Sequence, residues 1–122
     1  MQPSRSGWGI AAGISGFLAL VMGAAGAHAV ADPHAAALVG QASLYQLIHA
    51  GALLWLGGAR GRCATLARWM FLAGTVLFCG TIYLKELAGW ESAVRLAPVG
   101  GTSLMLGWLL IALAHGIQKR ES

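Results

Sequence analysis

Residues 8–30 read WGIAAGISGFLALVMGAAGAHAV, an apolar run without a single Asp, Glu, Lys or Arg. An α-helix rises about 1.5 Å per residue, so this run is long enough to cross the roughly 30 Å hydrocarbon core of a bilayer. The run therefore predicts a membrane-spanning helix. Arg5 before it and Ala27-His28-Ala29 near its end are also features of a secretory signal. The run exceeds the about 7 to 15 apolar residues of a signal core, so we expect a retained helix.

Three further apolar stretches predict helices over about residues 42–58, 64–84 and 98–116. Between the first two helices, Asp32-Pro33 favours a turn, and we expect a loop over residues 31–41. Arg68, near the start of the third helix, is expected to extend its head group toward the interface. The chain, residues 1–122, is thus predicted to be all-α, a single transmembrane domain folded as an integral membrane four-helix bundle.

The composition agrees with this class of protein, because 57% of the 122 residues are hydrophobic and only 10% are charged. The net charge of +4 raises the question of nucleic-acid binding. The basic residues, however, flank apolar spans and lack the interleaved aromatic residues that stack on bases. We therefore expect no nucleic-acid partner.

The distribution of Lys and Arg predicts the orientation. Arg5, the cluster over residues 60–68 and the pair Lys119-Arg120 lie on one side, whereas the other side carries Lys85 and Arg95 beside acidic neighbours. Because cytoplasmic loops are enriched in Lys and Arg, both termini are predicted to be cytoplasmic. Cys63 and Cys79 would then lie near opposite faces of the membrane, so we expect no disulfide.

Small residues recur at spacings of three and four along the first helix. They are Gly9, Gly13, Gly16, Ala19, Gly23 and Ala27. Such a stripe lets a second helix approach closely, and we predict that it is a helix-packing surface.

Tyr45, Gln46 and His49 share one face of the second helix, because residues three and four apart stack on one side. A histidine within a membrane span calls for a partner. We expect one from His28 or its neighbouring backbone, or, as the second choice, from the fourth helix. His28, Tyr45, Gln46 and His49 are thus candidate ligand-binding residues in the outer half of the bundle, for haem b, a quinone, a metal ion or protons. The alternative is a set of hydrogen bonds that is purely structural.

No catalytic residue is predicted. Ser43 and Cys79 lack a recognisable neighbouring base, and the spans contain no paired carboxylates. We expect the protein not to be an enzyme.

Four ordered motifs resemble the YgdD/YwdK-type family of small membrane proteins. They are Gly23-Ala24-Ala25-Gly26-Ala27-His28, Tyr45-Gln46-Leu47-Ile48-His49-Ala50, residues 74–83, and Pro98-Val99-Gly100-Gly101 with Gly107-Trp108. The resemblance implies a four-helix protein of the bacterial inner (cytoplasmic) membrane, with eukaryotic relatives and no known activity. It carries over His28, Tyr45, Gln46, His49, Tyr83 and Gly100-Gly101, whereas Cys79 and Lys85-Glu86 depart from the family pattern.

Two functions remain open. The first is a non-enzymatic accessory, structural or assembly subunit that contacts membrane lipids and packs against itself or a larger membrane complex. The second is a ligand-binding or permeation protein that uses the histidine, tyrosine and glutamine cluster.

Overall fold

A computed structural model describes residues 5–121 and, within them, the side chains of residues 7–116. The chain forms the helices α1 (Arg5–His28), α2 (Pro33–Leu56), α3 (Arg62–Ala88) and α4 (Ala97–Glu121), with a short 3-10 helix, η1 (Glu91–Leu96), before α4. Over the described residues there is no strand, and four helices are long and apolar enough to cross a membrane. The predicted all-α membrane fold is confirmed.

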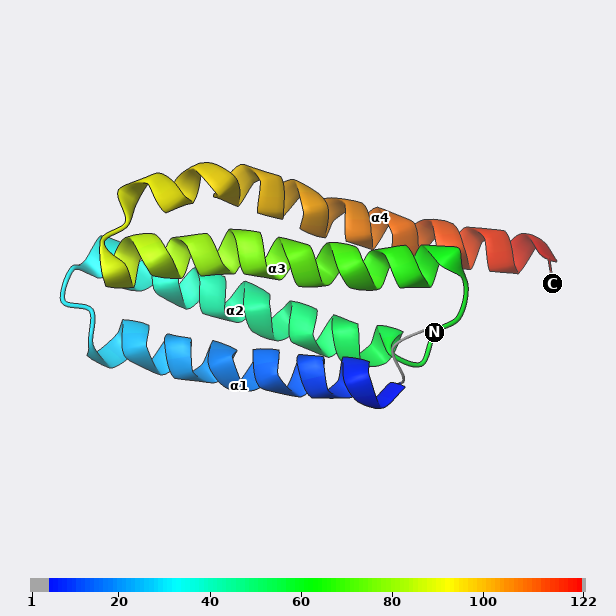
Figure 1. The fold of residues 1–122 in the computed structure, drawn as a ribbon, viewed down its shortest axis with the longest axis horizontal. Helices are drawn as coiled ribbons and strands as arrows, with labels where there is room; N and C mark the ends of the chain where they lie inside the picture. The colour runs from blue at the N-terminus through cyan, green and yellow to red at the C-terminus, as the bar shows by residue number, and fades with distance from the viewer. Residues whose placement is uncertain (1–4, 122) are drawn as a thin grey trace.

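Helices α1 and α2 form one hairpin and α3 and α4 form another, and the two hairpins pack together through α2 and α3 (Figure 1). The closest packing is between α1 and α2 and between α3 and α4, and α2 against α3 joins the two pairs. The start of α1, the turn between α2 and α3, and the end of α4 lie at one end of the bundle (Figure 1). The basic residues Arg60 and Arg62 lie at this end, which we call the basic end.

Helix α2 begins at Pro33, nine residues before the predicted start at residue 42. Asp32 caps this helix, because its Oδ2 accepts a hydrogen bond from the Ala35 N–H at 2.9 Å, and Pro33 occupies the first turn. Asp-Pro favours a turn, but it equally suits a helix N-terminus, since proline has the required φ and lacks an N–H. The predicted loop over residues 31–41 is therefore helical from Pro33 onward.

Glycines allow α3 and α4 to touch through their backbones. A Cβ atom at Gly100 would overlap the backbone N of Phe78, and one at Gly107 would overlap the Phe71 ring. Such contacts bring two helices closer than larger side chains permit. Glycine is therefore required at these positions for packing.

The contact face of α1 differs from the predicted small-residue stripe. Its members against α2 are Gly16, Ala19, Gly23 and Gly26, with Ala19 fully buried. A Cβ at Gly9 or Gly13 would meet nothing within 4 Å, and Ala27 is exposed. The stripe therefore divides into a closed face and an open flank, which we call the Gly9–Gly13 flank.

Each pair of helices that is consecutive in the chain is joined by a hydrogen bond from a small polar side chain to a backbone carbonyl. The bonds are Ser43 Oγ to Ala19 O at 2.6 Å, Cys79 Sγ to Ala42 O at 3.3 Å, and Ser103 Oγ to Met70 O at 2.8 Å. Close backbone approach makes these bonds possible, and they satisfy hydroxyl and thiol groups that would otherwise lack partners in the membrane.

Arg68 extends its head group toward the α2–α3 turn at the basic end, as predicted, but it is buried there, with 4% of its surface exposed. Its Nη1 donates to Leu56 O at 2.6 Å and to Ala59 O at 2.9 Å, and its guanidinium lies 5.5 Å from the centre of the Trp8 ring. The last carbonyls of a helix have no partner within the helix and carry the negative end of its dipole. The charge of Arg68 is therefore shielded from solvent at the basic end, where the Leu56 carbonyl that ends α2, the Ala59 carbonyl of the turn and the Trp8 ring stabilise it.

Candidate functional site: a polar network in a membrane groove

A groove of about 410 Å³ lies between α1 and α3, with Gln46 of α2 reaching into it. Most of its wall is apolar, from residues such as Ile14, Leu18, Leu72 and Val76. Four residues add oxygen or amide groups to this wall. They are Ser15, Gln46, Thr75 and Tyr83. An apolar cleft with few polar groups is the usual form of a small-molecule site.

Gln46 connects three helices inside this groove. Its Nε2 donates to Ser15 O at 3.1 Å and to Ser15 Oγ at 3.3 Å, and its Oε1 accepts from the Tyr83 hydroxyl at 2.7 Å. The Ser15 carbonyl can only accept, so the amide nitrogen must face α1 and the amide oxygen must face α3. The network thus holds Gln46 in one orientation.

The groove retains hydrogen-bonding capacity beyond this network. The Tyr83 oxygen can still accept a hydrogen bond, and the Ser15 hydroxyl can still donate one. The Thr75 side chain also lines the groove, and no hydrogen bond joins its hydroxyl to the described side chains or backbone. Because a hydroxyl without a partner costs free energy in an apolar place, this wall suits a molecule with a hydrogen-bond acceptor.

His49 lies outside the groove, where α2 meets α4. Its Nε2 accepts from the Trp108 indole N–H at 3.0 Å, and its Nδ1 lies 2.6 Å from Tyr45 O. An indole nitrogen only donates, so Nε2 is the acceptor and Nδ1 carries the proton. Both nitrogens of this neutral imidazole are therefore used within the protein, and neither offers a free lone pair to a metal.

The structure does not bring His28, Tyr45, Gln46 and His49 into one cluster. His28 is exposed at the end of α1, and Tyr45 is exposed and stacks on Phe78 with ring centres 5.7 Å apart. His49 lies sixteen residues after Pro33, about 24 Å along α2 at about 1.5 Å per residue. It is past the middle of the helix, toward the basic end, rather than in the half that contains His28.

Two consequences follow for cofactors. His28 and His49 are too far apart to ligate one haem iron, and the described residues contain no group of three His, Cys, Asp or Glu placed to hold a metal.

The partner of His49 comes from the fourth helix, which was the second choice from the sequence.

Sequence reasoning missed Ser15, Thr75 and Trp108 as members of these networks. The available signal was weak, because all three are uncharged side chains and the spans of Thr75 and Trp108 contain other hydroxyl groups as well. Ser15 is the only hydroxyl within residues 8–30, which is the one feature that singles it out.

The helices, the buried polar network and the membrane-facing groove define a small multi-pass membrane protein. The chain belongs to the family described as "Protein of unknown function (DUF423)", whose model matches residues 22–101. The family resemblance drawn from the four motifs is confirmed.

Relatives cover nearly the whole chain. It is 39% identical over 119 residues to the UPF0382 inner membrane protein YgdD of Escherichia coli K12, covering 92% of this chain and 91% of that protein. It is 31% identical over 115 residues to a UPF0382 membrane protein of Haemophilus influenzae, covering 89% and 91% of the two chains. A UPF0382 membrane protein of Staphylococcus aureus is 28% identical over 107 residues, with 83% and 88% covered. No solved structure matches. The protein is an integral protein of the inner membrane.

Proposed function

We propose that this chain is a non-enzymatic accessory or assembly subunit that packs in the membrane against further copies of itself or within a larger membrane complex. The observation that carries the proposal is the Gly9–Gly13 flank. The two glycines are four residues apart on α1, and a Cβ at either would meet nothing within 4 Å. A small residue every fourth position lets a partner helix approach closely, and this flank is open to such a helix.

The remainder of α1 supports a division between internal and external packing. Gly23 is occupied from within the chain, because a Cβ there would lie 2.7 Å from Ser43 Oγ. The Gly9–Gly13 flank adjoins large exposed apolar side chains such as Ile10 and Phe17, which are 62% and 67% exposed. Such a surface suits lipid or another transmembrane helix.

The proposed absence of enzymatic activity is supported by the state of the candidate nucleophiles. The Ser43 hydroxyl donates to Ala19 O and the Cys79 thiol donates to Ala42 O. Both groups are buried and bonded to carbonyls that cannot act as general bases. Nucleophilic catalysis requires a base within hydrogen-bonding reach of the nucleophile.

Native purification of the full chain in mild detergent tests the association. Gly13→Leu is expected to lower the associated fraction seen by cross-linking and light scattering, while thermal stability is retained. Gly51→Leu is the matched control, because Gly51 is also exposed and also has nothing within 4 Å of its Cβ position. A wild-type chain that always runs as a free monomer without co-purifying protein would contradict the proposal.

The groove favours a second candidate function, the binding of a lipophilic molecule with a carbonyl group, of which a quinone is one class. The Thr75 and Ser15 hydroxyls would donate to the carbonyl, and the apolar walls would enclose the hydrocarbon part. Binding of a soluble quinone analogue to purified protein tests this function. Thr75→Val, which removes the hydroxyl at similar volume, is expected to weaken binding, whereas Thr102→Val on the exposed side of α4 is not. Equal affinity for the two variants would count against the groove as the site.

A further inference from the structure

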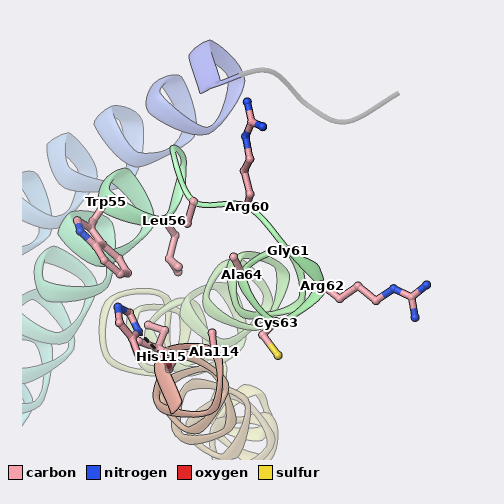
Figure 2. Close-up of a pocket in the computed structure, with 11 residues that line it drawn as sticks. Trp55, Leu56, Arg60, Gly61, Arg62, Cys63, Ala64, Ala114 and His115 are labelled. Atoms are coloured by element: carbon pink, nitrogen blue, oxygen red, sulfur yellow. Dashed lines mark hydrogen bonds between the residues drawn. The ribbon is translucent and has the colours of Figure 1, made fainter. Parts of the chain in front are cut away.

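A second cavity, of about 590 Å³, lies at the basic end of the bundle, away from the groove. Its walls come from the end of α2, the turn between α2 and α3, the first residues of α3 and the second half of α4 (Figure 2). Neither of the two proposed functions uses this cavity.

The interior of the cavity is apolar. Leu56 and Ala64 are buried within it, and Ile111 and Ala114 line it from α4. The Trp55 and His115 rings stack with their centres 5.7 Å apart and their planes 15° apart, and Figure 2 shows them together at one side of the cavity. Hydrocarbon therefore fits this space, as it does other apolar cavities.

Two arginines add positive charge at one side of the cavity. Arg60 and Arg62 contribute to its lining, both are exposed, and their guanidinium groups extend outward into the open (Figure 2). No acidic residue lines it. The acidic side chains that the structure describes, Asp32, Glu86 and Glu91, belong to segments at the opposite end of the bundle. The two arginines are thus not compensated by a carboxylate of the described part of the chain.

The backbone adds to this field. Helix α3 begins after Gly61, which provides no side-chain cap for the first N–H groups of the helix. The residues of this first turn, Arg62, Cys63 and Ala64, line the cavity. Uncapped N–H groups and the positive end of the helix dipole favour an anion in the same place as the arginines.

We propose that this cavity binds an anionic glycerophospholipid. One acyl chain occupies the apolar interior, and the phosphate lies at the mouth, where Arg60 and Arg62 bind it. The cavity lies where membrane-spanning helices end, which is the depth of lipid head groups. The charge and the apolar volume match an amphipathic anion, whereas a free phosphate would leave the apolar interior unused.

Thermal stability of the purified full-length protein in detergent tests the site, with phosphatidylglycerol or phosphatidylcholine added in equal amounts. Phosphatidylglycerol is expected to raise the unfolding temperature more than phosphatidylcholine does, and native mass spectrometry is expected to detect it bound. The double variant R60Q/R62Q is expected to weaken phosphatidylglycerol binding by about 25-fold, since each basic residue near an anionic lipid surface contributes about fivefold.

Two controls separate this site from general attraction. K85Q/R95Q removes two positive charges at the other end of the bundle and is expected to leave binding unchanged. A114F fills the cavity from α4 without changing charge and is expected to prevent binding, whereas A112F on the exposed side of α4 is not. Equal binding of the two lipids, or equal losses in the two double variants, would overturn the proposal. If A114F fails to fold, the comparison of R60Q/R62Q with K85Q/R95Q still tests whether the lipid binds at this cavity.

Discussion

The Trp108 indole N–H donates to His49 Nε2 over 3.0 Å, and the two rings lie with their centres 5.7 Å apart. This hydrogen bond joins α4 to α2 inside an apolar layer that also contains Phe71. A donor-only group facing an imidazole fixes the tautomer, and the Tyr45 carbonyl accepts the hydrogen bond that the Nδ1–H group donates. Both ring nitrogens of His49 therefore have hydrogen-bond partners within the protein, and a structural role for His49 can be tested by substitution.

His49→Ala is expected to lower the free energy of unfolding by about 1 to 2 kcal/mol or more, because the Trp108 N–H loses its acceptor in a poorly hydrated place. His49→Gln, which keeps a donor and an acceptor, is expected to restore most of this loss. Thermal unfolding in detergent measures both, and Trp108→Phe completes a double-mutant cycle. A stable Gln variant that has lost association or ligand binding would instead assign imidazole chemistry to His49.

The close contact of α3 with α4 predicts a sharp difference between two adjacent glycines. Gly100→Ala places a methyl group against the Phe78 backbone, which cannot move aside without separating the helices. We expect a loss of about 1 to 3 kcal/mol. Gly101→Ala is the control, because its Cβ would lie 3.6 Å from the Phe78 ring, an ordinary contact. Equal unfolding temperatures for the two variants would show that the helices are less tightly packed than the structure describes.

The number of spans and their approximate positions could be predicted from the sequence, because the bilayer thickness sets a minimum apolar length. The start of α2 could not, since Asp32-Pro33 suits both a turn and a capped helix. The position of this helix start also determines where His49 lies along α2. Counting from a start at residue 42 placed His49 in the outer half, whereas the start at Pro33 places it past the middle of the helix.

The sequence also does not show which side of each helix faces the protein interior and which faces lipid. In a soluble protein, hydrophobic periodicity identifies the buried side of a helix. In a membrane helix, the side toward lipid is as apolar as the side toward the interior, so the pattern carries little information about direction. For this reason Gly13 and Gly23 were both predicted to lie on one helix-packing stripe. In the structure, Gly13 is exposed and Gly23 packs against Ser43.

Arg68 is expected to contribute to the free energy of unfolding rather than to the orientation of the helices in the membrane. Arg68→Met removes the donors to the Leu56 and Ala59 carbonyls, and we expect a loss of about 1 to 3 kcal/mol. Arg68→Lys keeps a charge but lacks the planar guanidinium that reaches both carbonyls, so partial recovery is expected. Arg95→Gln, at an exposed position, is the control and should be nearly neutral. An Arg68→Met variant as stable as this control would exclude a capping role.

The last prediction concerns orientation, for which the two cysteines are well placed. Cys63 is partly exposed at the basic end, whereas Cys79 is buried and its thiol donates to Ala42 O. If the basic end faces the cytoplasm, as the enrichment of Lys and Arg predicts, a membrane-impermeant maleimide should leave Cys63 unlabelled in sealed spheroplasts and label it in inverted vesicles. Glu91→Cys in a Cys63→Ser background is the positive control, because residue 91 is exposed at the opposite end and should be labelled from outside. Cys79 should remain unlabelled in both preparations as long as the fold is intact. Rapid labelling of Cys63 in sealed spheroplasts, with no labelling of the Glu91→Cys variant, would reverse the orientation and place the arginine-lined cavity in the outer leaflet.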